Sequence, residues 1–141
     1  MAISCVRKLE FDAAHRVMEH ESQCKYLHGH RYKLEAFFEA KELDALGRVV
    51  DFGKIKELLG AWIDEYWDHA TILFDKDKEL GEAIASITQQ KIFYLDSNPT
   101  AENMALFLLH HVCPKLFEGH DIVCTEIILH ETPNCFVRAV L

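Results

Sequence analysis

The sequence lacks the usual marks of a secreted, membrane-bound or disulfide-stabilised protein. Residues 1–8 contain no long apolar stretch of the kind found in a signal peptide. No run approaches the roughly 20 apolar residues that a membrane-spanning helix needs. The five cysteines are an odd number and include no C-x-x-C pair, which argues against a disulfide framework and a thiolate zinc finger. We therefore expect a cytoplasmic protein.

Positive charge is also scarce, because 15 Lys and Arg stand against 23 Asp and Glu, for a formal net charge of −8. Such a chain has no broad electrostatic attraction for polyanions, so we expect neither a nucleic acid nor a membrane partner. A small anionic substrate is still compatible, since a few local cations can hold it. The length of 141 residues, the 50% hydrophobic content and only three prolines predict a single domain over residues 1–141.

Alternating hydrophobicity predicts strands near both ends of the chain. Residues 30–39 alternate apolar and charged side chains, and residues 3–11 follow a similar pattern. Residues 122–131 and 135–141 are separated by turn-forming residues, so they should pair as a hairpin. Residues 92–95 can add a short strand.

Helical spacing is clearest over residues 54–67, and a weaker helix is predicted over about 78–90. A third helix should follow Thr100, a natural N-cap, and run to about residue 117, with Pro114 ending or kinking it. The order of strands, helices and strands favours an α+β fold. We expect an antiparallel four-stranded sheet with helices on one face.

The pattern most suggestive of chemistry is Cys24-Lys-Tyr-Leu-His28-Gly-His30, preceded by His15. Alternate residues of an extended backbone project to one side, so His28 and His30 can reach one ion, and Gly29 permits a close or bent backbone. His15, after the first predicted strand, supplies a third corner. Three His ligands and an open position describe a catalytic zinc site. An H-G-H alone is a weak signal, because a single histidine is usually a surface or core residue.

The other histidines have no comparable spacing, and we interpret them as structural or solvated. They are His20, His110, His111, His120 and His130.

Further residues have both a structural and a functional interpretation. The pair Asp68-His69 follows the 54–67 helix, and on local grounds it is simply a polar helix end. Cys24 is an inert loop thiol unless a metal or a histidine favours its thiolate, which can act as a base or a nucleophile. Glu131 is either a solvated strand end or a carboxylate that accepts paired N–H donors from a planar heterocycle.

Taken together, these motifs resemble the 6-pyruvoyl-tetrahydropterin synthase family over nearly the whole chain. The three residues between Cys24 and His28 are similar to the spacing in its bacterial branch, which forms 6-carboxy-5,6,7,8-tetrahydropterin for queuosine biosynthesis. Each motif is modest, but six in the same order are specific. They are Phe11-Asp-Ala-Ala-His15, Cys24-x-x-x-His28-Gly-His30, Val49-Val-Asp51-Phe52, Asp68-His69, Asn98-Pro-Thr-Ala-Glu-Asn103 and His130-Glu131-Thr132.

The resemblance implies the T-fold and a zinc-dependent lyase. Its substrate would be 7,8-dihydroneopterin triphosphate, and its products 6-carboxy-5,6,7,8-tetrahydropterin, acetaldehyde and triphosphate. It also implies a homo-oligomer, a hexamer made of two trimers, with active sites between subunits. The residue roles that it implies are zinc ligation by His15, His28 and His30, catalysis by Cys24, Asp68, His69 and Glu131, and substrate binding by Glu131, Thr100 and Glu102.

Other functions fit parts of the same pattern. On the same scaffold, the chain is alternatively a pyruvoyl-tetrahydropterin synthase or a pterin side-chain aldolase. A zinc hydrolase would need a carboxylate base beside the metal and would not depend on Cys24. A non-catalytic protein would bind zinc or pterin tightly without turnover.

Overall fold

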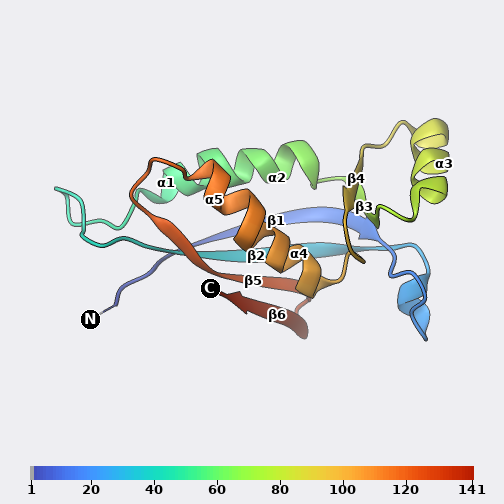
Figure 1. The fold of residues 1–141 in the computed structure, drawn as a ribbon, viewed down its shortest axis with the longest axis horizontal. Helices are drawn as coiled ribbons and strands as arrows, with labels where there is room; N and C mark the ends of the chain where they lie inside the picture. Colours follow the sequence, from blue (N-terminus) through green and yellow to red (C-terminus); the bar gives the residue numbers. More distant parts are fainter. Residues whose placement is uncertain (1) are drawn as a thin grey trace.

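A six-stranded mixed sheet forms the centre of the computed structural model, which describes residues 2–141 (Figure 1). The strand order is β4-β3-β1-β2-β5-β6. The strands β1, β2, β5 and β6 pair antiparallel, whereas β3 runs parallel to both β1 and β4. The strands are β1 (Cys5–His15), β2 (His28–Glu39), β3 (Ala70–Phe74), β4 (Ile92–Leu95), β5 (Val123–Thr132) and β6 (Cys135–Val140).

The prediction of a purely antiparallel four-stranded sheet was therefore wrong. The four long strands were predicted, and so was the short strand at 92–95, but β3 was missed. Its first three residues pair with Ala13–His15 of β1. Strand β3 is short and nearly all buried, so it shows no alternation of apolar and polar residues by which a strand is recognised.

Two long helical segments cover one face of the sheet, and a third lies at the end where β3 and β4 are added (Figure 1). Both long segments contain a π-helical turn in their middle. They consist of α1 (Phe52–Ile55), η2 (Lys56–Gly60) and α2 (Ala61–Tyr66), and of α4 (Ala101–Phe107), η3 (Leu108–Val112) and α5 (Cys113–Leu116). The other helices are α3 (Lys78–Thr88) and the short 3-10 helix η1 (Gln23–Lys25). None of the helices formed by residues 2–141 is long and apolar enough to cross a membrane.

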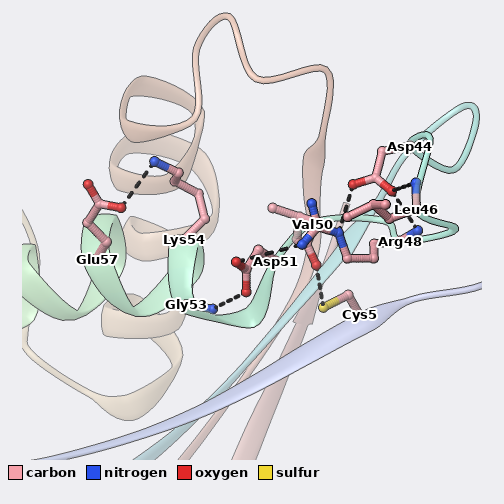
Figure 2. Close-up of polar contacts among 9 residues, drawn as sticks. All are labelled: Cys5, Asp44, Leu46, Arg48, Val50, Asp51, Gly53, Lys54 and Glu57. Carbon is pink, nitrogen blue, oxygen red and sulfur yellow. Dashed lines mark hydrogen bonds and ion pairs between the residues drawn. The ribbon is translucent and has the colours of Figure 1, made fainter.

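Side-chain caps explain where the two long helical segments begin. Asp51 accepts a hydrogen bond from the backbone N–H of Gly53 at 3.0 Å (Figure 2), so α1 starts earlier than the predicted residue 54. Thr100 accepts from the backbone N–H of Asn103 at 3.1 Å, which confirms its prediction as an N-cap. The helical segment does not end at Pro114, which lies at the start of α5 directly after the π-helical turn.

The alternation of side chains along β1 decides the geometry of the candidate site. Phe11, Ala13 and His15 are buried on the face that the helices cover. Asp12 and Ala14 project from the opposite face. The end of β1 therefore presents ionisable side chains on both faces of the sheet, His15 on one and Asp12 on the other.

Candidate functional site

Three histidines converge where β1 ends and β2 begins. The antiparallel register pairs His15 with His28 and places His30 opposite Ala13, so all three rings lie on one face. The ring centroids are 4.7 Å apart for His15 and His28, 5.1 Å for His15 and His30, and 4.8 Å for His28 and His30. One nitrogen from each ring lies within 4.8 Å of the others, so the predicted group is brought together and could hold a metal ion.

Backbone carbonyls orient two of these rings. The Nδ1 atom of His15 lies 2.7 Å from the Pro99 carbonyl oxygen, and the Nδ1 atom of His28 lies 2.7 Å from the Tyr26 carbonyl oxygen. A carbonyl only accepts, so each Nδ1 carries the proton and each Nε2 keeps its lone pair. The Nε2 atoms of His15 and His30 are buried without a hydrogen-bond partner in residues 2–141. Buried ring nitrogens without a hydrogen-bond partner suit a metal ion, because zinc binds neutral imidazole nitrogen.

The electrostatics of the cluster favour neutral rings. His15 is only 2% exposed. This burial, with the neighbouring His28 and His30, lowers its pKa to about 4, although the bond to Pro99 opposes the shift. Burial also lowers the pKa of His30, against the opposing charge of Glu131. At neutral pH both rings are therefore uncharged and able to bind a cation.

The backbone between His28 and His30 approaches β1 closely. A Cβ added at Gly29 would lie 3.3 Å from the carbonyl oxygen of Ala13, which is tighter than an ordinary van der Waals contact. Glycine therefore allows the two strands to bring the histidines together at this point.

Glu131 lies beside the cluster, near the end of β5. Its Oε2 atom is 3.7 Å from the Nε2 atom of His30. Burial and, secondarily, the charge of Glu131 raise the pKa of Tyr32 on the same face, so the phenol stays protonated. The Glu131 carboxylate is partly exposed and can still accept hydrogen bonds from a ligand.

Cys24 lies near His28, in the 3-10 helix η1. It is half-buried and lines a surface hollow of about 420 Å³ together with Gln23, Tyr26 and His28. The backbone N–H of Val17 donates to the Cys24 carbonyl at 2.8 Å, which ties this loop to the segment that follows His15.

Asp68 and His69 form a hydrogen-bonded pair at the junction of α2 and β3. The Nδ1 atom of His69 lies 3.0 Å from Oδ2 of Asp68, and Oδ1 of Asp68 accepts from the backbone N–H of Asp12 at 3.0 Å. Burial alone would raise the pKa of Asp68. The hydrogen bonds from Asp12 and His69, with the charges of His69 and Lys91, outweigh it and hold that pKa below its usual range.

This pair does not join the three histidines within one chain. Its imidazole is 74% exposed and lines a hollow whose other residues include Asp12, Ala14, His30 and Arg31. The side chains of Asp12, Ala14 and Arg31 project from the face of the sheet opposite to His15, so the His69 ring borders that opposite face.

Comparison with known proteins identifies the family. A family model described as 6-pyruvoyl tetrahydropterin synthase matches residues 4–140. The chain belongs to the 6-pyruvoyl tetrahydropterin synthase family. A relative from Rickettsia bellii, named 6-carboxy-5,6,7,8-tetrahydropterin synthase, is 56% identical over 96% of this chain and 99% of its own. A Haemophilus influenzae relative with the same name is 31% identical over 92% and 93% of the two chains.

Solved structures agree on the fold of this 6-pyruvoyl tetrahydropterin synthase family member. An uncharacterized protein from Wolinella succinogenes superposes with a TM-score of 0.81 at 20% identity, covering 99% of this chain and 98% of that one. The Caenorhabditis elegans 6-pyruvoyl tetrahydropterin synthase gives a TM-score of 0.70 at 20% identity, covering 100% and 96%. At these identities the likeness establishes the α+β T-fold.

The Asn98–Asn103 motif of this family member has a structural role that the sequence analysis missed. The side chain of Asn98 accepts from the N–H of Met18 at 2.9 Å and donates to its carbonyl at 3.3 Å, while Pro99 orients His15. The motif therefore supports the histidine cluster and the loop that leads to Cys24. Thr100 uses its hydroxyl oxygen as a helix cap, and Glu102 is exposed in the first turn of α4.

Proposed function

We propose that this protein converts 7,8-dihydroneopterin triphosphate and water to 6-carboxy-5,6,7,8-tetrahydropterin, acetaldehyde and triphosphate, as a zinc-dependent lyase of queuosine biosynthesis. The names of the full-length relatives support this product. The observation that carries the proposal is the convergence of three imidazoles near Cys24 and Glu131. The five cysteines are free thiols, which suits a reducing compartment, and we place the reaction in the cytoplasm.

His15, His28 and His30 would hold the zinc ion. When bound, zinc supplies Lewis-acid polarisation to oxygens of the substrate side chain. The protein contributes the fixed tautomers, because the carbonyls of Pro99 and Tyr26 keep the protons on Nδ1.

Cys24 is the proposed base that removes a proton from the substrate side chain. It lines the same hollow as His28, so a side chain that reaches the histidine cluster passes close to the thiol. A base must lie within hydrogen-bond reach of the proton that it takes, and this hollow provides that proximity.

Asp68 and His69 are proposed to exchange a second proton with the substrate. The bond from Nδ1 of His69 to Asp68 fixes the tautomer, leaves Nε2 free to accept a proton, and stabilises the imidazolium that results. Because the His69 ring is exposed, it can contact a substrate that is bound outside its own chain.

Glu131 is the proposed anchor for the pterin ring. A carboxylate can accept two parallel N–H bonds from the amino group and the ring nitrogen, which fixes both distance and orientation. Its position 3.7 Å from His30 would hold the side chain of the substrate over the cluster. We propose Thr100 and Glu102 as further residues at the edge of this pocket.

We further propose that the active site is completed by a second copy of the chain, in a hexamer of two trimers. Within one chain, the exposed His69 and the three-histidine cluster lie on opposite faces of the sheet. Strand β6 is an edge strand, and β1 pairs with β3 only over Ala13–His15. Strand edges left open in this way are natural sites for pairing with another copy.

The proposed reaction is tested by incubating zinc-loaded protein with 7,8-dihydroneopterin triphosphate and identifying the products by mass spectrometry. The expected result is 6-carboxytetrahydropterin together with acetaldehyde. Formation of 6-pyruvoyltetrahydropterin, or of a cleaved pterin that retains no carboxylate, would assign the chain to another reaction of the same scaffold. Tight pterin binding without any product would contradict catalysis.

A further inference from the structure

The backbone of His69 has a conformation that needs support from its surroundings. Its φ angle is +61°, in the left-handed region that residues other than glycine adopt only at an energetic cost. Its N–H donates to the Asp12 carbonyl at 2.6 Å, and its own carbonyl accepts from Nε2 of Gln90 at 3.0 Å. Both polar groups of the residue are therefore held, one by β1 and the other by the segment that follows α3.

The side chain of Gln90 is itself fixed. Its Oε1 atom accepts from the hydroxyl of Thr71 at 2.7 Å, and Thr71 is buried in β3. The carbonyl of His69 can only accept, so the amide nitrogen of Gln90 must face it and the amide oxygen must face Thr71. One amide thus links the carbonyl of His69 to a buried side chain two residues further along.

The same segment also holds the chain on the other side of Asp68. The Nζ atom of Lys91 donates to the carbonyls of Asp64 and Glu65 at 2.7 and 3.1 Å, at the C-terminal end of α2. Neighbouring residues after α3 therefore fix the backbone both before and after the Asp68–His69 pair.

We propose that Gln90 is a positioning residue for His69. By holding the His69 carbonyl, it keeps the backbone in the left-handed conformation and the imidazole against Asp68, with Nε2 directed to solvent for a substrate. The inference rests on the proposed function, in which His69 exchanges a proton. A shift of about 1 Å in such a group is enough to lower turnover by on the order of 100-fold.

A matched pair of substitutions separates positioning from simple stabilisation. Gln90→Asn shortens the side chain by one methylene and withdraws the amide from the His69 carbonyl. Gln89→Asn makes the same change at the neighbouring residue, where the amide bonds only the Ser86 carbonyl. The φ angle of Gln89 is +60°, a conformation that asparagine accepts well, so the control variant should fold normally.

The expected result is that Gln90→Asn lowers kcat by about 10- to 100-fold with little change in KM, whereas Gln89→Asn leaves both unchanged. In ¹⁵N-labelled protein, the ring signals of His69 should report protonated Nδ1 in the wild type and the control. In Gln90→Asn they should move toward an average of the two tautomers.

The kinetic and spectroscopic readouts distinguish failure of this inference from failure of the proposed reaction. If wild-type protein makes no product, the reaction is wrong, and the ring signals of His69 still decide whether Gln90 positions it. Wild-type kcat and unchanged ring signals in Gln90→Asn would overturn the inference. An equal loss of kcat in both variants would also overturn it, because a general weakening of the segment would then be the cause.

Discussion

The three-histidine cluster and the Asp68–His69 pair lie near the end of β1, on opposite faces of the sheet, and the structure holds them in different ways. His15 is buried, and its ring is oriented by a backbone carbonyl. His69 is exposed, and its strained backbone is held by bonds to Asp12 and Gln90. The comparison teaches that the three histidines that could hold a metal ion come together within one chain. The Asp68–His69 pair is held in one orientation, but its imidazole projects into solvent.

Removal of a proposed zinc ligand from the three-histidine cluster should have the largest effect. We expect His28→Ala to reduce bound zinc from about one ion per chain to a small fraction, because two imidazoles cannot replace three protein ligands. Activity should disappear with the metal. Elemental analysis after gel filtration measures the zinc content, and full retention of zinc by a folded variant would refute this ligand set.

Cys24→Ala should abolish most turnover while leaving the metal in place. Loss of a general base lowers kcat by about 10²- to 10⁴-fold, and a half-buried loop thiol contributes little to folding. We expect zinc content and melting temperature close to those of the wild type, measured by elemental analysis and calorimetry. Normal turnover in this variant would remove the base assignment and favour a metal-centred hydrolase.

His69→Ala should lower kcat by a similar factor, about 10²- to 10⁴-fold. Because the His69 ring lies on the opposite face of the sheet, zinc affinity should not change. A competition titration with a chromophoric chelator measures that affinity. Weaker zinc binding in His69→Ala would contradict the separation of the Asp68–His69 pair from the three-histidine cluster.

The smallest expected effect is a pH dependence of folding in the metal-free protein. Burial lowers the pKa of His15 from 6.5 to about 4, so the folded state resists protonation more than the unfolded state does. The contribution of His15 to the stability of the fold is therefore complete above pH 6.5, and it is lost as the pH falls toward 4. The free energy of unfolding should drop by at most about 1.4 kcal/mol per pH unit in this window.

Urea titrations of chelator-treated protein across this window measure the slope. His15→Gln has no imidazole to protonate, so its unfolding free energy should fall less steeply over the same pH range. An identical slope in the wild type and His15→Gln would show that another group controls the acid sensitivity.

Much of the three-histidine cluster could be predicted from the sequence, because the spacing of its residues follows the periodicity of a strand. His28 and His30 have the spacing that puts both side chains on one face of a strand, and the register of β1 and β2 brings the predicted His15 beside them. The position of the Asp68–His69 pair could not be predicted, since it depends on β3. That strand is buried and too short to show alternation, and its parallel pairing with β1 is a long-range contact.

The supporting residues were missed for a different physical reason. The side chains of Asn98 and Gln90 each make two hydrogen bonds to groups distant in the sequence, and no local sequence pattern predicts such a contact. Pro99 contributes a carbonyl, which every residue possesses. Only the folded chain reveals which carbonyl meets which ring.

The most direct test of the central claim is to mix two inactive variants. Cys24→Ala and His69→Ala chains are unfolded together, refolded as mixed oligomers, and assayed for product. If each active site takes Cys24 from one chain and His69 from another, random assembly of equal amounts gives about one quarter of the sites both residues, and activity should recover to that level. Mixed oligomers with no more activity than the separate variants would show that both residues serve the substrate from the same chain.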